Sequence, residues 1–334
     1  MSVVAEQAAK KNYLAGLREA LLEEMEARPD MVCIGEDIGL LGGAFGVTEG
    51  LMERYGPQRV IDAPISEAAI VGVAIGLAMQ GRPVMAEMQF IDFISCGFDQ
   101  IVNNAATMYY RTAGKVNLPI VIRGPSGGYG GGGPYHSQQN EAWFAHSPGL
   151  KVVCPSTPAD AKGLLTASLR DPNPVIFYEV KELYRKRDIE EPIPDNHFVP
   201  LGSASIRRPG NDVTVVTYGN PAFLCLQASD ELSSEGIDVE VIDLRTLVPM
   251  DDETVIQSIR KTNRVVVVNE ASRTCGFAAE VIARINEMAF EYLDAPPLRV
   301  TRADTPVPWV KPLETAVLPS VESICDAIRR VTRF

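Results

Sequence analysis

One carboxylate, Glu67, stands at the head of a segment that is otherwise small and apolar. Residues 65–76 read ISEAAIVGVAIG, and every residue from 68 to 76 is Ala, Val, Ile or Gly. A helix of this composition has no polar face, so we expect it to be buried on nearly every side. Ser66 is a candidate N-cap, and a helix N-terminus favours negative charge. Glu67 is therefore either an acid held by its own helix or a buried acid aimed at a ligand nitrogen.

A second candidate for chemistry, His136, follows a glycine-rich segment. Seven of the ten residues from 124 to 133 are glycine, and Pro125 and Pro134 interrupt or follow them, which excludes regular structure. Such a loop either flexes or lets the backbone approach a ligand closely. An imidazole at the mouth of a pocket transfers protons near neutral pH, whereas one on a flexible surface loop has no role. His146, before Ser-Pro-Gly, reads as a turn residue.

The elements that must position these residues alternate between helix and strand. In the first part of the chain the pattern predicts helices at 12–27, 49–55, 98–111 and 158–170, besides the Glu67 helix, and strands at 31–34, 83–89, 118–123, 151–154 and 174–179. This alternation implies an α/β fold with a mostly parallel sheet covered on both faces. We assign residues 1–185 to this first domain.

A second α/β domain is predicted over residues 204–334. Its strands are expected at 213–218, 239–243, 265–269 and 298–301, and its helices at 223–235, 251–261, 277–292 and 321–330. Residues 186–203 contain three prolines and show no helical or strand period, so we interpret them as an extended linker.

Composition limits the classes of function. The net charge of −12 argues against nucleic acid and an anionic membrane surface, and it suits a basic protein partner. Six cysteines without a CxxC pair suggest reduced thiols. We expect a cytoplasmic protein, because no long apolar segment and no signal-peptide pattern occur. Motifs for a P-loop, a zinc protease and a serine hydrolase elbow are missing as well.

Several stretches together resemble one family. They are GEDIG (35–39), ISEAAIVG (65–72), FDQIVNNAA (98–106), PIVIRGPSGG (119–128), HSQ (136–138), HSPGLKVVCPSTPADAKGLL (146–165), VIDLRTLVPMD (241–251) and DTPVP (304–308). In this order they resemble the beta subunit of the thiamine-diphosphate-dependent 2-oxo acid dehydrogenases, over nearly the whole chain. The resemblance implies an N-terminal pyrimidine-binding domain and a C-terminal domain like that of transketolase.

The resemblance also implies roles for individual residues. Glu67 matches the acid that hydrogen-bonds the aminopyrimidine ring of the cofactor, and Gln89 and Phe93 match positions beside that ring. His136 matches the histidine that serves acyl transfer to the lipoyl group. A set of four residues, Ile120, Ser168, Asp171 and Asn173, matches a potassium site of some family members.

The same resemblance implies partner chains. No GDG segment for Mg²⁺ and diphosphate occurs in the sequence, so an alpha subunit is expected to hold both, in a two-alpha, two-beta tetramer. A dihydrolipoyl acyltransferase core is the expected acceptor complex. The expected substrate is a branched-chain 2-oxo acid or pyruvate, and Glu141-Ala142 and KELYR (181–185) resemble the branched-chain enzymes.

Other functions remain open at this stage. They are an acetoin dehydrogenase beta subunit, another split transketolase-like enzyme, and a non-catalytic assembly subunit, which the presence of Glu67 and His136 disfavours.

Overall fold

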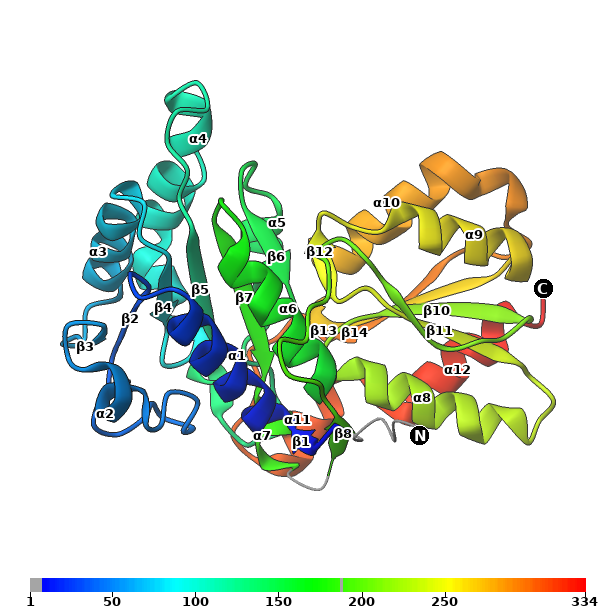
Figure 1. The fold of residues 1–334 in the computed structure, drawn as a ribbon. Coiled ribbons are helices and arrows are strands. Elements are labelled where there is room, and N and C mark those ends of the chain that lie inside the picture. The colour runs from blue at the N-terminus through cyan, green and yellow to red at the C-terminus, as the bar shows by residue number, and fades with distance from the viewer. Residues whose placement is uncertain (1–7, 187–188) are drawn as a thin grey trace, which may run out of the picture.

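The computed structural model describes residues 8–186 and 189–334, and these form two α/β lobes joined side by side (Figure 1). The first lobe is built on a seven-stranded sheet of order β12-β6-β7-β5-β4-β2-β3, and the second on a five-stranded sheet of order β14-β13-β10-β11-β9. Within the described residues, no helix is long and apolar enough to cross a membrane.

The first sheet is parallel except for one edge. Its strands are β2 (Val32–Gly35), β3 (Val60–Asp62), β4 (Val84–Glu87), β5 (Ile120–Ser126), β6 (Lys151–Val153), β7 (Val175–Val180) and β12 (Thr246–Val248). The central strands β4, β5 and β7 are buried along their whole length, as expected for a parallel sheet covered on both faces. Strand β12 comes from the second part of the chain and pairs antiparallel with β6. The two lobes therefore share this sheet.

Two layers of helices cover the first sheet. The helices are α1 (Tyr13–Ala27), α2 (Leu51–Tyr55), α3 (Glu67–Met79), α4 (Met108–Arg111), α5 (Glu141–Ala145), α6 (Pro158–Arg170) and α7 (Lys181–Arg185). Helices α1 and α6 pack together on one face, and α3 packs on the other with the 3₁₀ segment η1 (Ile91–Gly97). Side chains of Asn12 and Thr157 cap α1 and α6 through bonds of 3.0 and 3.2 Å.

Helix α3 differs from the sequence prediction, because one of its faces is open to solvent. Ala68, Ala69 and Gly76 are exposed, and Val73 and Met79 remain 49% and 47% exposed. Ser66 occupies the N-cap position, but its side chain accepts no hydrogen bond from a backbone amide of α3 in the described residues. The expectation of burial on nearly every side is therefore wrong for this chain by itself. An apolar composition predicts burial, but it does not say against which chain.

Two further segments also depart from the predictions. The single helix expected at 98–111 is a π-helical segment, Gln100–Ala105, followed by the short α4, and the Ala106 amide bonds the Ile101 carbonyl. Within the predicted linker, β8 (Glu190–Pro192) pairs antiparallel with β1 (Lys10–Asn12). The linker therefore folds back onto the start of α1.

The second lobe has helices on both faces of its sheet. Strands β9 (Ser205–Arg208), β10 (Val213–Thr217), β11 (Val239–Asp243), β13 (Val265–Ser272) and β14 (Leu298–Arg302) form the sheet. The helices are α8 (Pro221–Ser233), α9 (Asp252–Thr262), α10 (Phe277–Ala289), α11 (Lys311–Val317) and α12 (Val321–Val331). Helices α8 and α12 pack together, as do α9 and α10. Strand β9 is antiparallel to β11, and the other pairs are parallel.

An ion network lies inside the first sheet. Arg123 on β5 donates to Glu87 on β4 and to Glu179 on β7, and all three side chains are at least 96% buried. The Tyr184 hydroxyl also donates to Glu179. Because buried charges are costly without partners, this network ties together the carboxyl ends of three neighbouring strands.

Removing the cation from this network should destabilise the chain strongly. Arg123→Met leaves two buried carboxylates uncompensated, so we expect the free energy of unfolding to fall by about 3–5 kcal/mol. Urea denaturation measures this loss. Arg54→Met breaks an exposed ion pair with Glu26 and should cost at most about 1 kcal/mol. Equal losses in the two variants would show that the network does not support the sheet.

Candidate active site

Glu67 and Gln89 lie at the carboxyl edge of the first sheet. Strands β2, β3 and β4 are neighbours, and Asp37, Glu67 and Gln89 follow them in turn. The Gln89 amide donates to Asp37 at 3.4 Å. Burial raises the pKa of the Glu36 carboxyl, and the charges of Asp37 and Glu67 raise it further. Glu67 therefore shares this edge with two other carboxylates.

Phe93 and His136 form an aromatic cluster next to this edge. The imidazole of His136 meets the rings of Phe90 and Phe93 edge to face, with centroids 4.5 and 5.5 Å away. Phe93 belongs to η1, whose last residue, Gly97, packs directly against the backbone of Glu67. The structure thus brings His136, Phe93 and the head of α3 into one continuous region.

Buried polar groups hold the backbone around His136. One oxygen of Asp92 accepts the amides of Ser137 and Gln138 at 3.1 and 3.0 Å. The Lys181 ammonium donates to the carbonyl of His136. Burial raises the pKa of Asp92, while the two amides and Lys181 oppose that shift. The imidazole itself makes no hydrogen bond to any of the described residues, so its nitrogens are available to a substrate.

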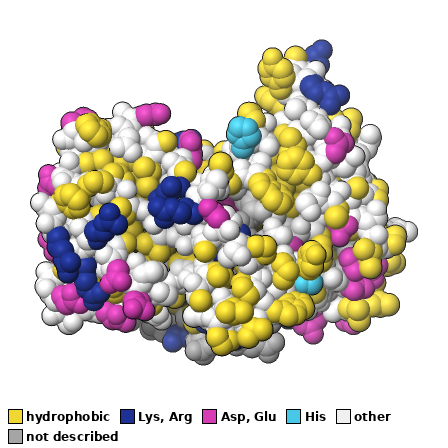
Figure 2. Space-filling model, turned by 180° about the vertical axis from the view of Figure 1, so that it is seen from behind, with side chains coloured by type: hydrophobic (Ala, Val, Ile, Leu, Met, Phe, Trp, Pro, Cys, Tyr) yellow, Lys and Arg dark blue, Asp and Glu magenta, His cyan; other side chains and the backbone are white. Residues whose placement is uncertain are grey.

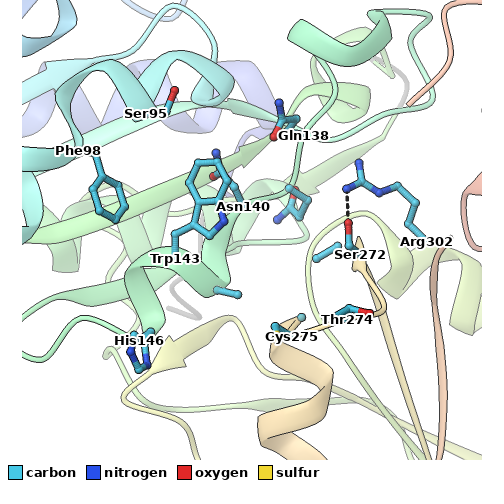
Figure 3. Close-up of a pocket in the computed structure, with 14 residues that line it drawn as sticks. Ser95, Phe98, Gln138, Asn140, Trp143, His146, Ser272, Thr274, Cys275 and Arg302 are labelled. Carbon is cyan, nitrogen blue, oxygen red and sulfur yellow. Dashed lines mark hydrogen bonds between the residues drawn. The ribbon is translucent and has the colours of Figure 1, made fainter. Parts of the chain in front are cut away.

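A cavity of about 950 Å³ lies between the two lobes, beside this region (Figure 3). Phe98, Trp143 and His146 line one wall, and Cys275 and Arg302 line the other. Seen from behind the view of Figure 1, Figure 2 shows hydrophobic side chains beside the hollow between the lobes. Gln138 belongs to the cavity wall, whereas Glu67, Gln89 and Phe93 do not. The Glu67 edge is therefore a surface region of this chain and not part of the cavity.

The four residues predicted to hold potassium offer one unpartnered side-chain oxygen among the described residues. The Asp171 carboxylate binds the Lys151 ammonium at 2.7 Å and the Asn173 amide at 2.9 Å. The Ser168 hydroxyl donates to its own helix, and Ile120 begins β5. The side-chain oxygen of Asn173 is buried and has no partner in the described parts of the chain. The side-chain oxygen of Asn173 is therefore available to a cation, but the Asp171 carboxylate is already paired with the Lys151 ammonium.

Sequence reasoning missed four residues around His136: Asp92, Lys181, Glu270 and Glu314. The last two lie on the second lobe and accept hydrogen bonds from Gly128 and Gly131 of the glycine-rich loop. Asp92 stands next to Phe93 in the sequence, so its position offered a signal. Lys181 begins the KELYR stretch, but nothing in the local sequence ties it, Glu270 or Glu314 to the His136 segment, since their partners lie 45 to 183 residues away.

Comparison with known proteins covers both lobes. Residues 9–187 match the transketolase pyrimidine-binding domain and residues 202–324 the transketolase C-terminal domain. A Rhizobium meliloti (strain 1021) protein, pyruvate dehydrogenase E1 component subunit beta, is 45% identical over 94% of this chain and 68% of its own length. The Bacillus subtilis (strain 168) 2-oxoisovalerate dehydrogenase subunit beta is 43% identical over 97% of this chain and 99% of its own.

This chain belongs to the family of 2-oxo acid dehydrogenase beta subunits. The resemblance found in the sequence motifs is confirmed, and so is the two-part α/β fold. A solved structure titled split gene transketolase, inactive beta4 tetramer, matches 97% of this chain and 99% of its own with a TM-score of 0.78. At 22% identity it shows that the fold is shared.

The family relationship does not distinguish between pyruvate and a branched-chain 2-oxo acid as the substrate. An Arabidopsis thaliana 2-oxoisovalerate dehydrogenase subunit beta 2 is 45% identical, the same value as for the Rhizobium pyruvate enzyme. Glu141, which resembles the branched-chain enzymes, is fully buried and accepts the Tyr218 hydroxyl at 2.6 Å. Its side chain therefore joins the two lobes, and it is not available to select a substrate.

Glu270 should make the stability of this beta subunit depend on pH. Burial raises its pKa from 4.5 to about 7. The folded chain then holds this proton more tightly than the unfolded chain. The contribution of the carboxyl to the free energy of unfolding is therefore fully present below pH 4.5, and it is lost as the pH rises from 4.5 to about 7. Glu270→Gln cannot ionise. The free energy of unfolding of the variant, minus that of the wild type, should therefore grow from about pH 5 to pH 8. Urea titrations across this range measure it, and a constant difference would contradict the shift.

Proposed function

We propose that this chain is the catalytic beta subunit of a 2-oxo acid dehydrogenase and works with an alpha subunit. The two together decarboxylate a 2-oxo acid on thiamine diphosphate and pass the acyl group to a lipoyl group. The observation that supports this best is the continuous region from Glu67 through Phe93 to His136. A proton-sharing acid and a free imidazole are the two groups that these two steps require.

The edge around Glu67 fits the pyrimidine half of the cofactor. A half-buried carboxyl, the Gln89 amide and the aromatic rings of Phe90 and Phe93 suit a flat ring with polar nitrogens. Glu36 and Asp37 add negative charge, which favours a ring that gains a proton and repels a diphosphate. When bound, thiamine diphosphate would supply the nucleophilic carbon that decarboxylation of a 2-oxo acid requires. Glu67 would share a proton with the ring nitrogen and hold the ring in place.

Diphosphate and Mg²⁺ are assigned to the alpha subunit. Within the described residues one group of three acids, Glu19, Glu23 and Asp195, is spaced to hold a metal. Lys162 lies 2.9 and 2.8 Å from Glu19 and Glu23, and Lys11 also binds Glu19. These acids are thus paired with lysines, and they stand on the α1 side of the sheet. Nothing about them suits a diphosphate-bound metal.

The open face of α3 fits a partner subunit. Its exposed side chains are small or apolar, and Ile65, just before the helix, is 76% exposed. A side chain added at Gly76 would meet nothing within 4 Å, so a second helix can approach the backbone closely there. A partner covering this face would bury the head of α3 and exclude water from Glu67, as in the predicted two-alpha, two-beta tetramer.

Two finer assignments have weaker support. Potassium at Asp171 and Asn173 would use the free oxygen of Asn173, but it has to share Asp171 with Lys151. Docking of the dihydrolipoyl acyltransferase core through overall acidity is also less favoured than the sequence suggested. Residues 204–334 contain 19 acidic residues, but Glu240, Asp243, Glu270 and Glu314 among them are buried. A docking surface would therefore need a local patch rather than the net charge of the domain.

The assembled enzyme should be tested on pyruvate and on branched-chain 2-oxo acids. Activity on one class when the alpha subunit is present, and none with either chain alone, would support the proposal and decide the substrate. Discrimination between the two is worth only about 1–3 kcal/mol per methylene and depends on residues of both chains.

Replacing Glu67 should affect decarboxylation without unfolding the chain. Glu67→Gln keeps the shape of the side chain but cannot share a proton, so we expect the rate to fall about 10²–10⁴-fold. Reduction of an artificial electron acceptor measures the rate. Glu36→Gln removes a neighbouring charge from the same edge and should be much milder. The role of Glu67 would be lost if hydrogen–deuterium exchange at the thiazolium carbon kept its wild-type rate in Glu67→Gln.

Replacing His136 should separate the two steps. In His136→Ala we expect acyl transfer to a lipoyl domain to fall about 10²–10⁴-fold, because proton donation to the dithiolane is lost. Decarboxylation assayed with an artificial acceptor should fall less. His146→Ala, which alters the cavity wall, serves as the control. Equal losses in both assays of His136→Ala would instead place this residue in decarboxylation.

Gly76→Leu should block assembly but not folding. The new side chain has open space in this chain, and helix propensity favours leucine over glycine by somewhat less than about 1 kcal/mol. Size-exclusion chromatography of the chain co-expressed with alpha should show complexes smaller than the two-alpha, two-beta tetramer. Asp326→Leu, on the exposed side of α12, is the matched control. A tetramer of normal size in Gly76→Leu would show that the open face of α3 does not belong to the subunit interface.

A further inference from the structure

The glycine-rich loop before His136 packs against the C-terminal lobe rather than projecting into solvent. The amide of Gly128 donates to Glu270 on β13, and the amide of Gly131 donates to both oxygens of Glu314, at 3.1 and 3.2 Å. The Trp309 ring lies on Gly133, where a Cβ atom would come within 2.1 Å of it. The glycines therefore permit close contact between the two lobes.

The Glu314 side chain is buried in this contact between the loop and the C-terminal lobe. Its side chain is fully buried, so its charge requires compensation from nearby donors. Apart from the amide of Gly131, it has the Lys311 ammonium at 3.4 Å. Lys311 donates in turn to the carbonyl of Tyr129 at 2.5 Å, and the Tyr129 hydroxyl donates to the carbonyl of Pro319 at 2.9 Å. Helix α11 and Pro319, two residues beyond its end, thus hold the loop through several polar contacts.

We propose that Glu314 and Glu270 are positioning residues for His136. They belong to the C-terminal lobe, and they fix the loop whose end carries the imidazole. Asp92 and Lys181 fix the same segment from within the first lobe, so the loop is held from both sides. This inference rests on the proposed role of His136 in acyl transfer.

Hydrogen exchange of the full-length chain tests the contact without any activity. In Glu314→Ala the Gly131 amide loses its acceptor, so the peptide covering residues 126–135 should exchange faster than in wild type. Glu314→Gln keeps an acceptor oxygen and should restore slow exchange. Glu240→Ala is the control, since Glu240 is equally buried in the same lobe but pairs with Lys261. If Glu314→Ala does not fold, Trp309→Ala, at a side chain 62% exposed, removes a contact to the same loop.

Assays of the enzyme assembled with alpha test the consequence for His136. A displaced imidazole should slow acyl transfer to a lipoyl domain by up to about 10²-fold in Glu314→Ala, with a smaller effect on decarboxylation. Glu314→Gln should recover most of the rate.

Each result has a separate meaning. If hydrogen exchange of residues 126–135 were unchanged in both Glu314→Ala and Trp309→Ala, these side chains would not hold the loop. Faster exchange with normal acyl transfer would overturn the positioning role. If His136→Ala itself transferred acyl groups normally, the proposed function of His136 would fail, while the exchange data would still decide whether Glu314 holds the loop.

Discussion

The buried pairing of Arg123 with Glu87 and Glu179 is the constraint on which the active region depends. The three residues sit near the carboxyl ends of adjacent parallel strands, and their side chains are buried away from solvent. Leaving any one of them unpaired in such a place is strongly unfavourable, so the strand ends cannot shift independently. Strand β4 leads to Gln89 and η1, β5 leads to the glycine-rich loop, and β7 leads to Lys181. One ion network therefore anchors the three first-lobe segments that lead to the surroundings of His136.

In the function proposed here, the region around Glu67 is half of a site. Its carboxylates favour a protonated ring and repel phosphate, and its apolar neighbours on α3 face outward. Both features fit the proposal that a second chain completes the site and covers the helix. A carboxyl can share a proton with a ring nitrogen most effectively in a dry environment. Assembly would supply that environment, which links the chemistry of this chain to its quaternary structure.

His136 is placed by residues from both lobes. Asp92 binds the two amides that follow it, Lys181 binds its carbonyl, and Glu314 holds the loop in front of it. Strand β12 strengthens the connection, because it carries the C-terminal part of the chain into the first sheet. The imidazole ring packs against Phe90 and Phe93 and makes no hydrogen bond to the described residues. A rigid backbone with an unpaired side chain suits a group that must donate a proton to an arriving substrate.

Local patterns in the sequence were enough to determine much of this protein. The alternation of helix and strand predicted the α/β class, and the capping Thr157 with Pro158 predicted α6 over the range observed, Pro158–Arg170. Motif order identified the family, while an apolar segment and a glycine-rich segment had already singled out Glu67 and His136. The sequence could not show that α3 has an open face, because an apolar helix looks the same whether its own chain or a partner covers it. It also left two uses for the glycines, flexibility or ligand approach, whereas the structure shows packing between lobes. Glu314 and Gly131 are 183 residues apart, and only the tertiary fold brings such groups into contact.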